Sequence, residues 1–173
     1  DRDSGLQIID VSKPSKPKPL GSYNTPGFAY GVAVVGTTAY VADDTGGLQV
    51  IDISTPSAPK LLGSYNTPDS AYGVAVVGTT AYVADYSSGL LVIDVSTPSA
   101  PMLLDSYDTP DLAQGVAVVG TTAYVADGQS GLLVIDVSTP SKSKLLGSYD
   151  TPGFASGVTV VGTMAYVADG QSG

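Results

Sequence analysis

The chain has 173 residues, of which 43% are hydrophobic, so it can form a folded core and is not typical of a disordered segment. The net charge is −9 and the basic residues are one arginine and six lysines, which argues against binding to nucleic-acid phosphates or an anionic membrane surface. Cysteine, histidine and glutamate are absent, which excludes disulfides, thiolate or imidazole metal sites, and Ser-His-Asp or Cys-His catalysis.

One short segment, a glycine followed by an apolar run that ends in aspartate, occurs four times. Its copies begin at Gly5, Gly47, Gly89 and Gly131, 42 residues apart, and Gly173 stands where a fifth copy would begin. A fixed period in this range is typical of propellers and solenoids. We therefore interpret residues 1–173 as a single array with sequence repeats 5–46, 47–88, 89–130 and 131–172.

Within one repeat we expect four strands, at 31–35 (strand A), 38–42 (strand B), 48–53 (strand C) and 60–65 (strand D). The segment between strands C and D contains two prolines, which cannot take part in a central strand, so it must be a loop. Strands A to C are nearly continuous apolar runs, which indicates a sheet buried on both faces. Four short antiparallel strands covered by copies of themselves form a propeller blade. We predict an all-β protein, a β-propeller of 42-residue blades; a β-solenoid would normally use shorter coils and parallel pairing.

The chain is cut within a blade. It begins in a B–C turn and supplies strands C and D first, as an N-terminal half-blade, and it ends with strands A and B at 157–168, as a C-terminal half-blade. The unpaired edges could meet within one chain as a four-bladed ring, or between two chains as an eight-bladed homodimer. They could also belong to a piece of a longer array. We favour the second and third arrangements, because six to eight blades is the commoner size.

The segment Leu90-Leu91-Val92-Ile93-Asp94 and its copies resemble the LVIVD-repeat family of bacterial and archaeal proteins. The unit is also similar in layout to YVTN-type surface-protein propellers, with Ala39-Tyr40-Val41-Ala42-Asp43 in the place of that signature. The resemblance implies a β-propeller, often secreted or at the cell surface, without a defined activity. We accordingly expect an extracellular or cell-surface location, and no apolar run is long enough for a membrane span.

Two sets of aspartates recur in phase. We expect the set that ends strand C to accept hydrogen bonds from the following loop: Asp10, Asp52, Asp94 and Asp136. The set that ends strand B fits turn capping, with calcium binding as the alternative, since calcium prefers clustered carboxylates. The weak calcium candidates are Asp43, Asp44, Asp85 and Asp127. No other cofactor is expected. We predict that the recurring tyrosines of strand B, such as Tyr40, pack between blades.

A site that breaks the symmetry must use positions where the copies differ. These positions fall in the links from strand D to strand A and in the B–C turns, and both connections emerge on the same face of an up-and-down blade. That face should be acidic, because the lysines lie in or next to the C–D loops. Exposed aromatic residues among carboxylates favour a surface for a carbohydrate or a protein loop. The candidate residues are Phe28, Tyr30, Asp44, Asp69, Tyr72, Tyr86, Asp111, Gln114 and Phe154. The competing interpretation is that Phe28 and its equivalents pack beneath the link and that drift explains the other differences.

We predict a non-catalytic binding or adhesion module with a protein or carbohydrate ligand, and no nucleic-acid partner. The structural alternative is an assembly unit whose open half-blades pair between chains into a ring or fibre. An Asp-based enzyme that acts on glycosides is the remaining catalytic possibility, and it requires a pair of carboxylates with separated pKa values. Nothing in the sequence singles out such a pair, so we assign no catalytic residue.

Overall fold

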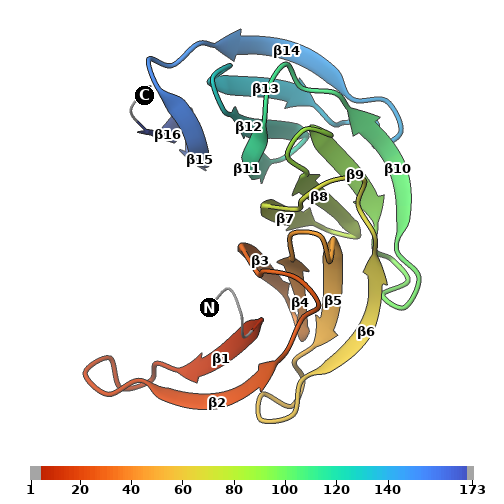
Figure 1. Cartoon of the computed structure of the whole chain (residues 1–173), viewed down its shortest axis with the longest axis vertical. Coiled ribbons are helices and arrows are strands. Elements are labelled where there is room, and N and C mark those ends of the chain that lie inside the picture. The colour runs from red at the N-terminus through yellow and green to blue at the C-terminus, as the bar shows by residue number, and fades with distance from the viewer. Residues whose placement is uncertain (1–4, 171–173) are drawn as a thin grey trace.

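The computed structural model describes residues 5–170, and these form β-strands arranged as an open arc of five sheets (Figure 1). Blade 1 is two-stranded, with β1 (Leu6–Asp10) and β2 (Lys18–Tyr23). Blade 2 has β3 (Gly31–Val35), β4 (Thr38–Ala42), β5 (Leu48–Asp52) and β6 (Lys60–Tyr65). Blade 3 has β7 (Gly73–Val77), β8 (Thr80–Ala84), β9 (Leu90–Asp94) and β10 (Met102–Tyr107). Blade 4 has β11 (Ala113–Val119), β12 (Thr122–Asp127), β13 (Leu132–Asp136) and β14 (Lys144–Tyr149), and blade 5 has β15 (Phe154–Val161) and β16 (Met164–Gly170).

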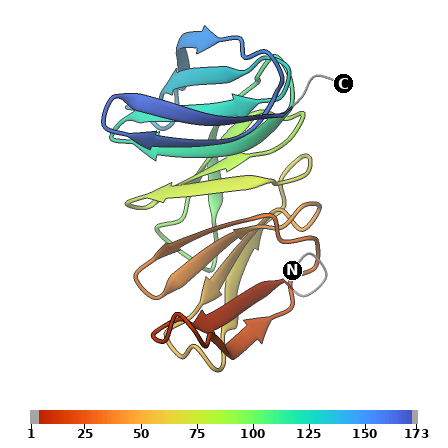
Figure 2. The same ribbon diagram turned by 90° about the vertical axis from the view of Figure 1, so that its left-hand side faces the viewer.

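All strand pairs are antiparallel between sequence neighbours, which confirms the predicted up-and-down blade. The strand A equivalents line the inner side of the arc and the strand D equivalents form its outer side (Figure 1). In side view the blades are stacked along the arc, and the ends of their strands lie on its two opposite sides (Figure 2). The two-stranded sheets at the ends of the arc are separate, so in the described residues the blades do not close into a ring. The described residues contain no helix long and apolar enough to cross a membrane.

In blade 2 the observed bounds of strands A, B and D match those expected from the repeat, and strand C ends one residue earlier, at Asp52. In blade 5 the two strands begin at Phe154 and end at Gly170, beyond the expected range 157–168. The Asp52 carboxylate accepts a hydrogen bond from the Ser54 backbone N–H at 2.8 Å, and this local turn ends the strand. The same bond recurs in the other copies, at Asp10, Asp94 and Asp136. The predicted capping role of these four aspartates is therefore confirmed.

The core lies between successive blades. Tyr40, Leu48 and Val50 of blade 2 are buried against a row of apolar residues in blade 3, including Val83 and Ile93. Blades 3 and 4 repeat this arrangement. A single sheet therefore cannot bury its apolar faces alone and depends on its neighbours for stability. The predicted packing of the strand B tyrosines between blades is confirmed for Tyr40 and Tyr82, whose pKa values are raised by burial, whereas Tyr166 in blade 5 is 51% exposed.

Strand A is less buried than its sequence predicts. In blade 2 the side chains of Val32 and Val34 are exposed, whereas β4 and β5 are almost fully buried. The expectation that both faces of strand A are covered was wrong for this blade. Strand A lines the open inner side of the arc, and Val32 and Val34 of blade 2 face the incomplete blade 1.

Candidate binding face

The D-to-A links and the B–C turns form one continuous rim, as expected from the topology. The B–C turn of each complete blade forms a short antiparallel bridge with the link that enters the next blade, as between Asp44 and Ala71. The Asp44 N–H donates to the Ala71 carbonyl at 3.0 Å, and the Ala71 N–H donates back to the Asp44 carbonyl at 3.1 Å. Tyr86 bridges Ala113 in the same way. Residues of neighbouring blades are thereby held next to one another on this rim.

In each complete blade a buried carboxylate binds the link that enters the blade. Asp43 is completely buried, and its carboxylate accepts hydrogen bonds from the Gly27 N–H at 2.8 Å and from the Thr25 hydroxyl. Asp85 and Asp127 are equally buried and accept from the backbone N–H groups of Asp69 and Asp111, each at 3.0 Å. Burial raises the pKa of all three carboxyl groups, and the donors from the links oppose that shift.

The strand B aspartates thus hold the D-to-A links, a role that differs from the expected capping of their own B–C turns. The described residues contain no group of three or more acidic side chains placed to hold a metal ion. The backbone of Asp44 forms the bridge to the next blade, and its φ is 49°.

Three of the candidate tyrosines come together in a stacked row. The ring centroids of Tyr30 and Tyr72 are 4.4 Å apart, with 22° between their planes. The centroids of Tyr72 and Tyr86 are 5.3 Å apart, with 29° between their planes. Tyr30 and Tyr72 each lie directly before strand A of their own blade, and Tyr86 lies in the B–C turn of blade 3. We call these three residues the tyrosine row; it runs across the boundary between blades 2 and 3.

The tyrosine row is partly open to solvent and lies next to a carboxylate. Tyr30 is 37% exposed, and Tyr72 and Tyr86 are half-buried. The pKa of Tyr72 is raised first by burial, then by Tyr30, and also by the charge of Asp44. The row therefore combines aromatic edges and phenol hydroxyls with nearby negative charge, a combination suited to cations and to polar ligands.

Tyr86 has an unusual backbone conformation. Its φ is 46°, in the left-handed region that large side chains rarely adopt, whereas the equivalent residue of blade 4 is Gly128, with φ of 52°. Left-handed geometry costs a non-glycine residue about 1–2 kcal/mol. Asp44 of blade 2 has the same conformation, with φ of 49°, so the turn requires left-handed geometry whichever residue occupies it, and in blade 3 that residue is a tyrosine.

Two of the candidate aspartates have internal partners. The Asp69 carboxylate accepts from the Ser70 N–H at 2.8 Å and from the N–H and hydroxyl of Ser87, which ties the link to the B–C turn. The Ser87 hydroxyl is the main reason that the pKa of Asp69 is lowered. Asp111 accepts from the Gln129 N–H in the corresponding position of blade 4. Both carboxylates therefore shape the rim beside the tyrosine row.

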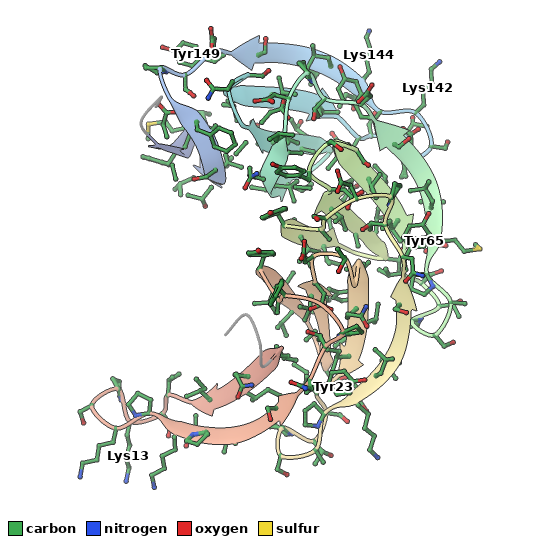
Figure 3. The ribbon with its side chains drawn as sticks, viewed as in Figure 1. Lys13, Tyr23, Tyr65, Lys142, Lys144 and Tyr149 are labelled. Atoms are coloured by element: carbon green, nitrogen blue, oxygen red, sulfur yellow. The ribbon has the colours of Figure 1, made fainter. Side chains whose placement is uncertain are left out.

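The other candidates lie on the rim without joining the row. Phe28 is 44% exposed, which contradicts the interpretation that it packs beneath the link, while Phe154 and Gln114 are half-buried. No ring contact within residues 5–170 connects either phenylalanine with the tyrosine row. Lys13 and Lys142 of the C–D loops and Lys144 at the start of β14, by contrast, project outward at the periphery of the arc (Figure 3).

The stacking of the three tyrosines was not predicted from the sequence, although the repeat pattern contains a signal for part of it. Tyr30 and Tyr72 occupy the same position in adjacent copies, 42 residues apart, so they had to lie on neighbouring blades. Tyr86 occupies a different position in the repeat, and only the bridge between its turn and the next link shows how close it lies to the row.

A family model described as LVIVD repeat matches the chain at residues 1–25, 26–67, 68–109, 112–151 and 152–173. No curated protein sequence matches the chain. Among solved structures, the computationally designed Ika8 protein is similar with a TM-score of 0.76 and 12% identity, over 97% of this chain and 50% of that one. The computationally designed Ika4 protein is similar with a TM-score of 0.71 and 12% identity, over 84% of this chain and 88% of that one.

A chain of a nidogen/laminin complex is similar with a TM-score of 0.65 and 16% identity, over 89% of this chain and 60% of that one. The chain thus spans half the length of the first of these three structures. At such low identity the similarity shows the fold alone, and it supports the propeller-type blade derived above.

Proposed function

The chain belongs to the LVIVD repeat family, and from this premise we propose that it is a non-catalytic binding module that acts outside the cell or at its surface. The tyrosine row is the centre of the proposed binding face. Because the fold alone assigns no ligand, the proposal rests on this particular surface.

The observation that carries the proposal is Tyr86. A stacked aromatic pair contributes about 0.5–1.5 kcal/mol beyond the area that it buries, which is no more than the cost of left-handed geometry at a tyrosine. The stability of the blade therefore does not explain the residue. A large aromatic side chain at this left-handed position, where the neighbouring blades have Asp44 and Gly128, is better explained by contact with a ligand.

The charge around the row favours a protein segment that carries lysine or arginine. Cations interact favourably with tyrosine rings, and Asp44 lies close enough to raise the pKa of Tyr72. The net charge of −9 would also speed the approach of a basic partner. Stacking within the row covers part of each ring face, which leaves less area for the flat contacts that sugars make. One of the similar structures comes from a nidogen/laminin complex, so a related fold occurs in an assembly of two proteins.

The proposal is tested by calorimetric titration with a short peptide of alternating lysine and glycine, and in parallel with a neutral glucan oligosaccharide. The peptide should bind, and its affinity should fall as salt is added. The fall is expected because dissolved ions screen electrostatic interactions beyond about 10 Å at 0.1 M salt. Tyr30→Ala and Tyr72→Ala should each reduce peptide affinity about tenfold, the size expected when a central aromatic contact is lost. Tyr72→Phe should retain most of it, because the ring remains.

Met102→Ala serves as the matched control. Met102 is an exposed apolar residue at the start of the outer strand β10, so its loss should leave peptide binding unchanged. Binding of the oligosaccharide but not of the peptide would refute the choice of partner class. Equal affinity of the parent chain and the two alanine variants for the peptide would refute the tyrosine row as the site.

A further inference from the structure

We propose that Tyr30 and Tyr72 form a site of oxidative cross-linking, at which one carbon–carbon bond joins their rings as dityrosine and fastens blade 2 to blade 3. Dityrosine is the product of two phenols in contact when an oxidant removes one hydrogen atom from each. The proposal rests on the geometry of this pair, and it holds whether or not the tyrosine row binds a ligand.

The close approach of these two tyrosines follows from the first residue of strand A. An added Cβ at Gly31 would lie 2.7 Å from the Tyr72 carbonyl oxygen and 3.2 Å from the Cα of Gly73. The backbones of blades 2 and 3 are thus in contact at the inner side of the arc (Figure 1), an approach that the missing Cβ makes possible. Tyr30 and Tyr72 directly precede these two glycines and are therefore held side by side.

The geometry of the pair suits coupling of the two rings. Their centroids are 4.4 Å apart and their planes differ by 22°, so the rings are stacked. A hydrogen bond between the two phenol groups is one reason, after burial and the charge of Tyr30, that the pKa of Tyr72 is raised. Two rings that are stacked and also joined through their hydroxyls bring together the ring carbons beside those hydroxyls. These are the carbons that bond to each other in dityrosine.

The reaction balances with hydrogen peroxide as the oxidant and a haem peroxidase as its catalyst. Each phenol O–H gives up one proton and one electron, which leaves a phenoxyl radical whose unpaired electron extends to the carbons beside the oxygen. The two radicals form one C–C bond between such carbons. Each of these carbons then loses its hydrogen as a proton, and each oxygen takes a proton back, which restores two phenols. The peroxide is reduced to two molecules of water.

Tyr86, the third member of the tyrosine row, has a looser contact with Tyr72. The centroids of these two rings are 5.3 Å apart, and among the described tyrosines only Tyr30 shares a hydrogen bond with Tyr72. In blade 4 the position of Tyr72 is occupied by Gln114, which has no ring to couple. The structure therefore favours the boundary between blades 2 and 3 as the place of the bond.

Tyr65 and Tyr107 provide a comparison within the same two blades. They too occupy equivalent positions one repeat apart, at the ends of the outer strands β6 and β10. Tyr65 lies at the outer side of the arc (Figure 3), and no ring contact within residues 5–170 joins it to Tyr107. Equivalence in the repeat is thus not enough for coupling, which also needs the close approach of the inner strands.

The bond would give the fold a covalent link between blades. The sequence contains no cysteine, so disulfides cannot supply one. A link from Tyr30 to Tyr72 encloses one whole repeat, and a closed segment of this length restricts the unfolded chain as a disulfide does. This restriction should raise the midpoint of thermal unfolding by roughly 5–15 °C.

The test is treatment of the dilute chain with hydrogen peroxide and a haem peroxidase, followed by mass spectrometry. The parent chain should become lighter by two hydrogen atoms while it stays a single chain, and it should gain the fluorescence of dityrosine. Trypsin cuts after Lys60, between the two tyrosines, so the cross-link should keep the two resulting fragments together. Fragmentation of this product should place the bond between Tyr30 and Tyr72. The yield should not depend on chain concentration, because both rings belong to one chain.

Variants that lose one phenol hydroxyl locate the bond. Tyr30→Phe and Tyr72→Phe each keep the ring but cannot form a phenoxyl radical there, so each should abolish the single-chain product. Tyr86→Phe and Tyr107→Phe remove the same group elsewhere in blade 3 and should leave the yield unchanged. All four variants keep their aromatic rings, so they should fold as the parent does.

Three results would overturn the proposal. The first is a parent chain that is oxidised, or coupled to other chains, without a bond between Tyr30 and Tyr72. The second is a single-chain product that persists in Tyr72→Phe, and the third is a bond between Tyr72 and Tyr86 in place of the expected one. Each of these results concerns the oxidation alone, and titration with the lysine–glycine peptide tests the binding face separately.

Discussion

Replacing Tyr86 by glycine and by alanine separates its strain from its contacts. The backbone of Tyr86 is fixed in left-handed geometry by two hydrogen bonds with Ala113, at 3.1 and 2.9 Å, so neither substitution is expected to change the path of the turn. Glycine relieves the strain and removes the ring. Alanine removes the ring and leaves the strain in place.

The two effects have comparable size. The left-handed conformation costs about 1–2 kcal/mol for a residue with a Cβ, and loss of the stacked contact with Tyr72 costs about 0.5–1.5 kcal/mol. Tyr86→Gly should therefore change the free energy of unfolding by no more than about 1.5 kcal/mol. Tyr86→Ala should be less stable than the glycine variant by about 1–2 kcal/mol.

Urea unfolding followed by circular dichroism measures both differences, and the lysine–glycine peptide measures the functional effect. Both variants should lose affinity for the peptide by a similar factor, because both lack the ring. An alanine variant as stable as the glycine variant would refute the argument that the turn is strained. A glycine variant that binds the peptide as the parent does would refute the functional role of Tyr86.

Three further predictions concern the framework. Burial raises the pKa of Asp127 above its ordinary 3.8, so the folded protein binds this proton more tightly than the unfolded chain and loses stability as pH rises from about 4 through the raised pKa. The variant Asp127→Asn keeps an acceptor for the link. Its free energy of unfolding in urea, relative to that of the parent, should therefore be higher at pH 7 than at pH 4, and a higher relative value at pH 4 would contradict this prediction. Gly63→Ala should lower the free energy of unfolding by about 1–3 kcal/mol, because its Cβ would meet the next C–D loop, and an unchanged urea midpoint would count against that close approach. Asp105→Ala should cost about 1–3 kcal/mol because it leaves the Ser143 N–H without its acceptor, and adding Ser143→Pro, which removes the donor, should recover part of that loss in a double-mutant cycle; no recovery would contradict it.

The fold could be predicted because the repeat encodes it locally. A glycine-containing turn, a pair of prolines and short apolar runs recur in phase, and they place the strands of blade 2 within one residue of their observed bounds. The in-phase aspartates that end strand C, exemplified by Asp52, could be assigned to capping because the loop backbone needs an acceptor two residues further on. These contacts lie within one repeat, so the sequence pattern contains them.

The features that the sequence did not predict depend on contacts between repeats. Asp105 stands where the other copies have glycine, and Ser143 stands where they have proline. Only the structure shows that the Asp105 carboxylate accepts a hydrogen bond from the Ser143 N–H in the next blade. The tyrosine row also joins two blades, and the strain at Tyr86 is a backbone property without a sequence signal of its own. The exposure of strand A in blade 2 follows from the openness of the arc beside it.

The most direct test of the account is an NMR titration of the chain, labelled with ¹³C in its tyrosine rings, with the lysine–glycine peptide. We predict that the ring signals of Tyr30, Tyr72 and Tyr86 shift together, while those of Tyr40 and Tyr82, buried between blades, stay in place. Shifts confined to tyrosines outside the row, or a peptide that binds while the signals of the row stay unchanged, would contradict the assignment of this rim as the binding face.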